Sequence, residues 1–133
     1  MSRQGRRALY TITTDSDRKL VTIKITGLIS TREVEQLYRE EHAAIRRMGC
    51  WLGDHYALVD LTECKLQLQD VAAAFQQQMS SSAKAKRLAL FTGSSLSRMQ
   101  VRRITQRDNA QIFATQEEAE NWLFNADDLS AAA

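Results

Sequence analysis

The stretch from Tyr56 to Thr62 is the feature that most constrains how this chain of 133 residues can fold. It is a short apolar run rich in residues that favour extended structure, and it contains an acid, Asp60, and ends in a hydroxyl, Thr62. A run of this kind is typical of a buried strand. We therefore predict a central strand over 56–61, around which the other elements of a small α/β domain are arranged.

Two runs rich in β-branched residues precede this strand, Leu9–Thr14 and Leu20–Thr26. In the second run apolar and polar residues alternate, which indicates a strand with one face toward the core and one toward water. The turn-forming cluster Asp15–Arg18 separates the two runs. We predict an antiparallel hairpin at the edge of the sheet.

Two more strands are expected after the central one. The continuous apolar run Arg87–Thr92 is typical of a parallel strand that is buried on both faces, and Gln111–Ala114 is a shorter strand. Several segments show the helical period of about 3.6 residues. We predict helices from the capping box Ser30–Glu33 to Gly49, from about Leu68 to Ser80, from about Ser95 to Arg107, and a short one after the capping box Thr115–Glu118.

The apolar residues of these helices are expected to face the core. They are Val34, Leu37, Tyr38, Ala44, Ile45 and Met48 in the first, Leu68, Val71, Ala72, Phe75 and Met79 in the second, Leu96, Met99, Val101 and Ile104 in the third, and Ala119, Trp122 and Leu123 in the last. The loop 50–55, which contains Trp51, is expected to be anchored to the domain by its apolar residues.

The order β-β-α-β-α-β-α-β-α predicts the α/β class, with right-handed crossovers and a mixed, mostly parallel five-stranded sheet with about four helices. A length of 133 residues fits one domain. We place this domain at residues 8–124 and expect residues 1–7 and 125–133 to be flexible tails.

The composition argues against several classes of function. The net charge of +2 creates no global field toward nucleic acid or an anionic membrane, and no apolar run is long enough to span a bilayer. Cys50 and Cys64 have no metal-binding spacing and fit free thiols in a reducing compartment. No apolar segment follows the basic N-terminus, so we expect no signal peptide and a cytoplasmic location. We also expect neither a metal nor another cofactor.

The order of elements, with the leading hairpin and the strand end Val59–Thr62, resembles the STAS domain family. Its fold is called SpoIIAA-like, and it includes sulphate-transporter domains and anti-sigma factor antagonists. The ending Ile112–Leu123, with a phenylalanine in a short strand and the pattern EEA-x-x-WL, resembles bacterial STAS-like proteins related to lipid-binding SEC14 domains. The resemblance covers about Leu9 to Phe124 and implies a SpoIIAA-like single domain that binds a protein partner or a lipid.

The resemblance also suggests where a partner binds. In anti-sigma factor antagonists the loop after this strand carries a serine that a partner kinase phosphorylates. Here the corresponding stretch, Glu63–Asp70, contains neither serine nor glycine, so we expect no phosphorylation switch. Asp70 falls near the position of that serine, where it is either a fixed negative charge or an ordinary acid at a helix N-terminus.

A second candidate site is Gly93–Arg98, where a predicted strand passes into a helix. Ligands of open α/β sheets bind beyond the carboxyl ends of the strands, and the N–H groups of a helix N-terminus suit an anion. The candidate anion- or ligand-binding residues are Gly93, Ser94, Ser95 and Arg98. The alternative is that one serine simply caps the helix and that Arg98 is solvated.

The third predicted helix also has a basic face made by Arg98, Arg102, Arg103 and Arg107. This face either binds phosphate groups or an acidic partner, or is simply solvated. No aromatic residues are interleaved with these arginines, so stacking on bases is not supported and we expect no specific nucleic acid partner.

Three functions follow, in order of preference. The first is a non-enzymatic regulatory or protein-interaction module of STAS type, which binds a partner through Thr62, Glu63, Cys64, Lys65, Gln69 and Asp70. The second is a protein that binds a small apolar or anionic ligand, such as a lipid, in a pocket at the carboxyl ends of the strands. The third is a small enzyme in which His55 acts with Cys50, Asp54 or Asp60, for which the sequence shows no catalytic set. A symmetric homodimer is compatible with each.

Overall fold

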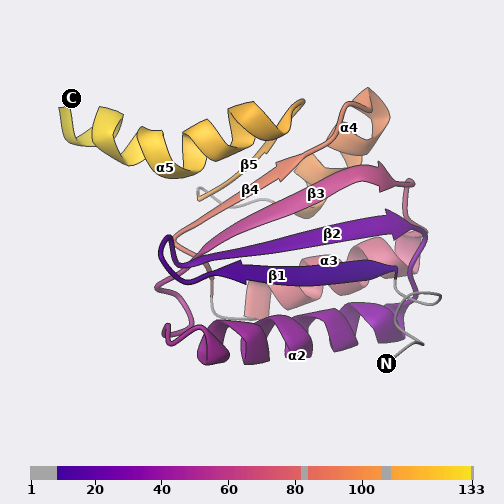
Figure 1. Cartoon of the computed structure of the whole chain (residues 1–133). Coiled ribbons are helices and arrows are strands. Elements are labelled where there is room, and N and C mark those ends of the chain that lie inside the picture. The colour runs from indigo at the N-terminus through magenta and orange to yellow at the C-terminus, as the bar shows by residue number, and fades with distance from the viewer. Residues whose placement is uncertain (1–8, 82–83, 106–108, 133) are drawn as a thin grey trace.

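The computed structural model describes residues 9–81, 84–105 and 109–132. Its five-stranded sheet has the order β1-β2-β3-β4-β5. β1 is antiparallel to β2, and each later pair of neighbours is parallel. β3 therefore lies in the middle of the sheet, as predicted (Figure 1). The strands are β1 Tyr10–Asp15, β2 Leu20–Gly27, β3 Tyr56–Cys64, β4 Arg87–Phe91 and β5 Ala110–Phe113.

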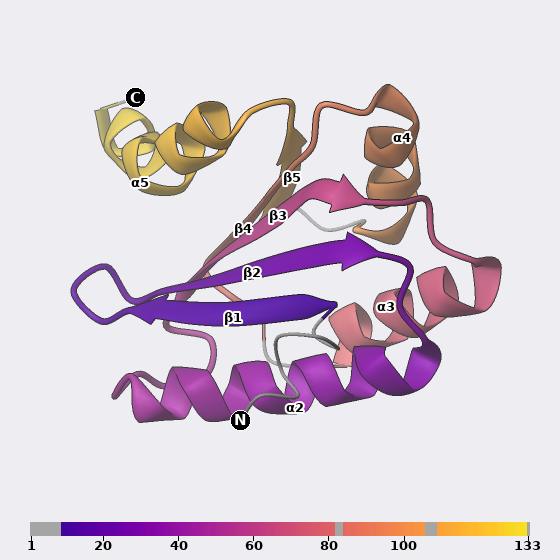
Figure 2. The same cartoon turned by 45° about the vertical axis from the view of Figure 1, so that its right-hand side comes forward.

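Helices cover both faces of the sheet (Figures 1 and 2). On one face lie α2 (Thr31–Arg47), α3 (Gln69–Ser81) and α4 (Ser95–Ile104), and on the other lies α5 (Gln116–Ala132). The α/β class, the order of elements and the mixed sheet agree with the prediction. In the described ranges, no helix is long and apolar enough to cross a membrane.

The buried apolar residues form two clusters, one on each face of the sheet. The larger cluster joins β2, β3 and β4 to α2, α3 and α4, and the smaller joins the same three strands to α5. Alternation along β3 produces this division, because successive side chains of a strand point to opposite faces. Ala57 and Val59 belong to the larger cluster, whereas Leu58 packs with Leu123 of α5 in the smaller one.

Local sequence sets the limits of α2. The Ser30 hydroxyl accepts the N–H of Glu33 at 3.1 Å, and the Ser30 N–H donates to the Glu33 carboxylate at 2.7 Å. The predicted capping box is therefore present. Gly49 follows the helix with a φ of +84°, the left-handed conformation that glycine adopts at low cost.

α5 begins where predicted but differs in its cap and its length. The Thr115 hydroxyl accepts the N–H of Glu118 at 3.2 Å, yet the Glu118 carboxylate accepts the N–H of Ala114, at 3.3 Å, instead of completing the box at Thr115. The predicted helix is short, with the domain ending at Phe124. The structure continues it to Ala132.

Two other element ends differ from the prediction. β3 extends beyond Leu61 to Cys64, because β2 continues to pair with it through Gly27 after a shift in register. α4 ends at Ile104, with Thr105 as its C-cap, so it ends before the predicted Arg107, which lies outside the described residues.

Three residues predicted to face the core are instead exposed: Leu68 by 61%, Leu96 by 63% and Met99 by 48%. In α4 the buried positions are Ser97 and Val101. These two are one helical turn apart, on a stripe that does not include Leu96 or Met99. The apolar residues of this helix therefore lie on two different faces. The face that packs against the core is the one with fewer large apolar side chains.

The loop between α2 and β3 is anchored by its apolar residues, as predicted, with the exception of Trp51. Trp51 is 84% exposed, so its indole holds nothing down. The neighbours of Trp51 anchor the loop, because Cys50 is buried and Leu52 packs against the larger cluster. The backbone turns between these two inward-facing residues, which directs the side chain of Trp51 into solvent.

Candidate functional site

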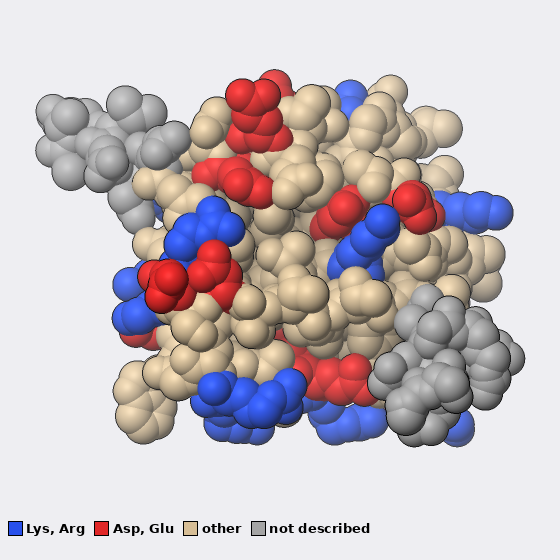
Figure 3. Space-filling model, in the orientation of Figure 1, with Lys and Arg blue, Asp and Glu red and all other residues tan. Residues whose placement is uncertain are grey.

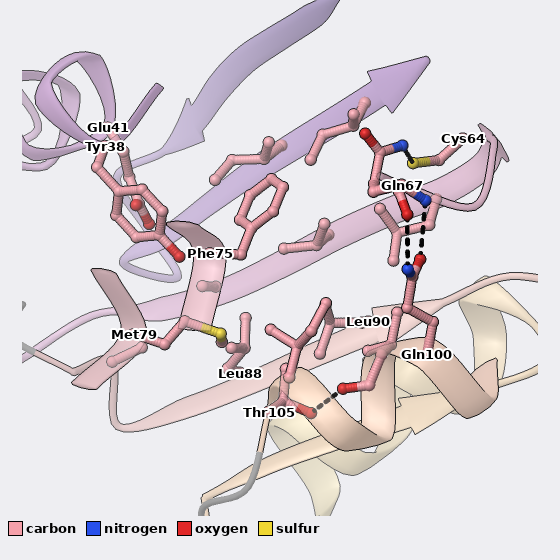
Figure 4. Close-up of a pocket in the computed structure, with 18 of the residues that line it drawn as sticks. Tyr38, Glu41, Cys64, Gln67, Phe75, Met79, Leu88, Leu90, Gln100 and Thr105 are labelled. Atoms are coloured by element: carbon pink, nitrogen blue, oxygen red, sulfur yellow. Dashed lines mark hydrogen bonds between the residues drawn. The ribbon is translucent and has the colours of Figure 1, made fainter. Parts of the chain in front are cut away.

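A cavity of about 120 Å³ lies between the sheet and the helices α2, α3 and α4. Figure 4 shows Phe75 and Met79 of α3 on one side of it and Leu88 and Leu90 of β4 nearby. Its apolar walls come from three neighbouring strands and from all three helices. The strand residues that line it are Ile23, Ile25, Ala57, Val59, Leu61, Cys64, Leu88 and Leu90.

The position of α3 accounts for the cavity. α3 packs against α2 and α4 more closely than against the strands. Its buried anchor is Val71, and the next residue that packs against the core is Ala74, whose methyl group fills little of the space above the sheet. Phe75 and Met79 reach in from the same helix and leave the rest of the space open. A well-packed interior has few voids larger than a water molecule, so this one is a distinctive feature.

Polar side chains from α2 line one part of the cavity. Tyr38 and Glu41 lie together in Figure 4, and His42 adjoins them in the sequence. Glu41 is only 8% exposed. Burial, and to a lesser extent the nearby Arg46 guanidinium, lowers the pKa of His42. The His42 imidazole is therefore neutral at pH 7.

His55 lines the cavity from the start of β3 and is 2% exposed. Its Nδ1 accepts the N–H of Gly53 at 3.2 Å, which places the proton of a neutral ring on Nε2. The Cys50 thiol donates to the carbonyl of Asp54 at 3.3 Å, while the Asp54 carboxylate pairs with Lys19 and Lys86. These contacts direct three of the four side chains of the predicted enzyme site to different partners. The fourth, the Asp60 carboxylate, accepts the N–H and the hydroxyl of Thr62 at 2.9 and 2.7 Å.

The other end of the cavity is organised by Gln67. Its Nε2 donates to the carbonyls of Gly27 at 2.9 Å and Lys65 at 2.6 Å, and its Oε1 accepts the N–H of Ile29 at 3.1 Å. Its Nε2 also lies 3.2 Å from the sulfur of Cys64. One amide group thus joins the loops that follow β2 and β3.

The backbone of Gln67 also joins these loops to α4. Its N–H donates to Gln100 Oε1 at 2.9 Å, and its carbonyl accepts from Gln100 Nε2 at 2.9 Å, as the paired dashed lines in Figure 4 show. Both glutamines line the cavity. Their role is not predictable from the sequence, because neither lies in a motif and a single glutamine between two apolar residues is an ordinary surface pattern.

Two of the predicted partner-binding residues line the cavity, Cys64 and Lys65. Burial raises the pKa of the Cys64 thiol, and the hydrogen bond from Gln67 offsets this in part. The thiol is therefore protonated at neutral pH, which does not favour a nucleophile. The other predicted partner-binding residues, Thr62, Glu63, Gln69 and Asp70, are exposed and do not line the cavity.

Those exposed residues lie beside apolar side chains. Leu28 follows β2, Leu66 and Leu68 flank Gln67, and Leu96 and Met99 lie on α4 near Gln100. All five are at least 45% exposed. We call them the carboxyl-end patch, because they follow the carboxyl ends of β2, β3 and β4. Gln67 holds their three segments together through its hydrogen bonds to Gly27, Ile29 and Gln100.

The predicted anion site at the start of α4 has internal partners. The Ser94 hydroxyl caps the helix by accepting the N–H of Ser97 at 3.1 Å, and the Arg98 guanidinium donates to the carbonyl of Thr92 at 2.9 Å. Gly93, Ser94, Ser95 and Arg98 do not line the cavity, whereas Ser97 does. Anion binding at these four residues stays a prediction.

The basic face predicted for this helix stays a prediction. Arg102 and Arg103 are exposed, and Arg107 lies outside the described residues. Within the described ranges, no group of three or more His, Cys, Asp or Glu side chains is arranged to hold a metal ion.

The sequence matches no protein-family model and no curated protein. The structure is similar to the crystal structure of an uncharacterized protein of the DUF3478 family, with a SpoIIAA-like fold, from Shewanella loihica PV-4. The match has a TM-score of 0.61 and 19% sequence identity, and it covers 86% of this chain and 91% of that chain. The fold is therefore SpoIIAA-like, as the sequence predicts.

Proposed function

We propose that this SpoIIAA-like domain is a non-enzymatic module that binds a small, mainly apolar ligand in the cavity beneath its sheet. The observation that carries the proposal is the cavity itself, with apolar walls from three strands and three helices. Ligand sites are typically mostly apolar concavities with a few well-placed polar groups. The polar groups here are Tyr38 and Glu41 at one end and Gln67 and Gln100 at the other.

The cavity volume limits the ligand. An apolar cavity of about 150 Å³ admits a molecule of the size of benzene, and this one measures about 120 Å³. A longer ligand requires α3 to move away from the sheet. Such a movement costs few contacts with the strands, because α3 packs mainly against α2 and α4. The chemistry that fits is a compact ring or a short aliphatic chain with a polar group at one end.

Ala57→Leu tests the location of the site. Ala57 lies on β3, is buried and faces the cavity, so a leucine there would occupy the space of the ligand. We expect wild-type protein to bind small apolar probes, measured by native mass spectrometry and by a fluorescent probe that responds to polarity. We expect Ala57→Leu to lose this binding.

Leu68→Ala is the matched control, because Leu68 is exposed and lies outside the cavity. This variant should bind the probes as the wild type does. If the folded Ala57→Leu protein binds as tightly as the wild type, the ligand is not in the cavity and the proposal is wrong.

The carboxyl-end patch supports a second function, binding of a protein partner beside Thr62–Asp70. Exposed apolar side chains gathered at one end of a molecule are typical of an interaction surface. The test replaces Leu66 and Leu68 by serine and measures binding to a partner identified by crosslinking. We expect the double variant to lose the partner and keep the probe in the cavity. Unchanged partner binding would exclude the patch.

A further inference from the structure

Trp51 has no role in the cavity or in the carboxyl-end patch. It lies in the loop between α2 and β3, at the opposite end of the parallel strands from that patch, and is 84% exposed. The loop itself is well anchored. Cys50 is buried and its N–H donates to the carbonyl of Ile45 at 3.3 Å, while Asp54 donates its N–H to the carbonyl of Trp51 at 3.0 Å. A fixed backbone therefore presents the indole to the surroundings.

Basic side chains surround this loop. Arg46 and Arg47 form the last turn of α2, and the carbonyl of Arg46 accepts the N–H of Gly49 at 3.0 Å as the chain turns. On the other side, the carbonyl of Lys84 lies 3.6 Å from where a Cβ on Gly53 would be. All three basic side chains are exposed.

Two more lysines reach the same loop through Asp54. Lys86 Nζ lies 3.0 Å and Lys19 Nζ 3.1 Å from its carboxylate oxygens. These two pairings lower the pKa of Asp54, so it remains charged at neutral pH. The local set of Lys19, Arg46, Arg47, Lys84 and Lys86 carries five positive charges against the single negative charge of Asp54, a net charge of +4. We call this set with Trp51 the tryptophan collar.

We propose that the tryptophan collar docks the domain on an anionic lipid bilayer. Trp51 would enter the interface, where the amphipathic indole is favoured, and the basic residues would face the headgroup phosphates. The net charge of the whole chain, +2, hides this site because acidic residues elsewhere balance the collar. On the face shown in Figure 3, basic side chains lie along the edge over α2, with acidic side chains beside them.

A bilayer fits the collar better than a protein partner does. A stable protein interface needs a core of several apolar residues, with on the order of 800 Å² buried on each side. Among the described residues, the other exposed large apolar side chains all belong to the carboxyl-end patch. A single indole surrounded by cations is instead suited to the boundary between headgroups and acyl chains.

The test measures co-sedimentation of the full chain with phosphatidylcholine vesicles, with and without phosphatidylglycerol. We expect binding to the anionic vesicles that weakens as salt is raised. Trp51→Ala should reduce the partition coefficient on the order of tenfold. The double variant Arg46→Gln/Arg47→Gln should reduce it roughly thirtyfold, since each basic residue near the surface contributes about one kcal/mol. Arg32→Gln, which removes an exposed basic residue from the first turn of α2, at the opposite end of that helix from the collar, should bind nearly as the wild type does.

Fluorescence gives an independent readout. The chain has two tryptophans, so Trp122→Phe leaves Trp51 as the only one, which excitation near the red edge of indole absorption selects over tyrosine. In this variant, anionic vesicles should shift the emission to the blue, and brominated lipids should quench it. Equal sedimentation of wild type and Trp51→Ala, or no shift in the single-tryptophan protein, would overturn the proposal. The proposal would also be overturned if the protein binds polyglutamate as tightly as it binds vesicles and Trp51→Ala does not weaken that binding. This result would indicate an acidic protein partner.

Discussion

At the scale of single residues, Gln67 makes the most connections at the candidate site. Its side-chain amide satisfies backbone groups of two loops, and its own backbone pairs with Gln100. A buried backbone group that loses its partner costs more than the hydrogen bond contributes when made. Gln67 therefore stabilises the fold mainly through the three backbone groups to which it hydrogen-bonds, those of Gly27, Ile29 and Lys65.

We predict that Gln67→Ala lowers the free energy of unfolding by about 1–3 kcal/mol. The loss comes from the unsatisfied backbone groups of the two loops, and urea denaturation measures it. Gln69→Ala, at an exposed position two residues away, should change the same quantity by less than about 0.5 kcal/mol. If both substitutions have equal effects, the hydrogen bonds of Gln67 do not hold the loops.

His42 makes a prediction about pH. Burial first, and Arg46 second, lower its pKa in the folded state. The unfolded chain then binds a proton more readily, at the ordinary histidine pKa of about 6.5. Above that pH, His42 is neutral in both states and the free energy of unfolding is unaffected. The free energy of unfolding then decreases as pH falls toward the lower, folded pKa of His42.

NMR titration of the His42 Cε1–H signal measures the folded pKa directly, and we expect a value below the ordinary one. In Arg46→Gln the pKa should rise part of the way back, because burial, the larger cause, remains. An ordinary pKa for His42 in the wild type would contradict the burial of this ring beside the cavity.

At the scale of elements, α3 and α5 are attached to the sheet in different ways. α5 places Ala119 and Leu123, both fully buried, against the strands. Arg18 and Arg87 strengthen this attachment from the sheet side, with their guanidinium groups 4.9 Å from the ring centre of Phe124 and 5.3 Å from that of Trp122. α3 has one buried residue of comparable kind, Val71.

We predict that Leu123→Ala destabilises the fold by about 2–5 kcal/mol, because it removes a fully buried side chain from the smaller core cluster. Leu68→Ala removes the same atoms from the exposed start of α3 and should cost less than about 0.5 kcal/mol. Urea denaturation of both variants provides the comparison. Similar losses would mean that α5 does not pack as described.

At the scale of the whole molecule, the two faces of the sheet differ in packing. The face under α5 has a closed core, whereas the face under α2, α3 and α4 contains the cavity. Ala57 faces the cavity and Ala89 faces α5, and both are buried. Two alanines in adjacent parallel strands therefore lie in different environments, one beside the cavity and one in the closed core.

We predict opposite tolerance to a larger side chain at these two positions. Ala57→Leu should change the free energy of unfolding by no more than about 1 kcal/mol, since the new atoms enter existing space. Ala89→Leu should destabilise by about 1–3 kcal/mol or more through overpacking. Thermal and urea unfolding of the two variants measure the difference. Equal destabilisation would show that the cavity is already filled by protein atoms in solution.

The order and type of the elements were predictable from the sequence. The alternation in β2, the apolar run of β4 and the capping box of α2 each specify local structure through short-range sterics and hydrogen bonds. Such signals are complete within a few residues. They also lead to the SpoIIAA-like fold, because the order of strands and helices leaves few topologies open.

The candidate site could not be predicted in the same way. Trp51 was expected to help anchor its loop and is exposed, and Leu96 and Met99 were expected in the core and lie on the surface. Gln67 and Gln100, 33 residues apart, meet only when α4 packs beside the loop after β3. Which face a side chain takes depends on neighbours that are distant in the chain.

The sequence by itself therefore determined the central strand Tyr56–Cys64 in all but its last residues, the elements around it and the class of fold. Tertiary structure alone decided that α3 packs against helices instead of closing on the sheet, and so created the cavity. It also decided which apolar side chains are exposed. The physical reason is that secondary structure follows from local backbone preferences, whereas a cavity is the space left after all distant elements have packed.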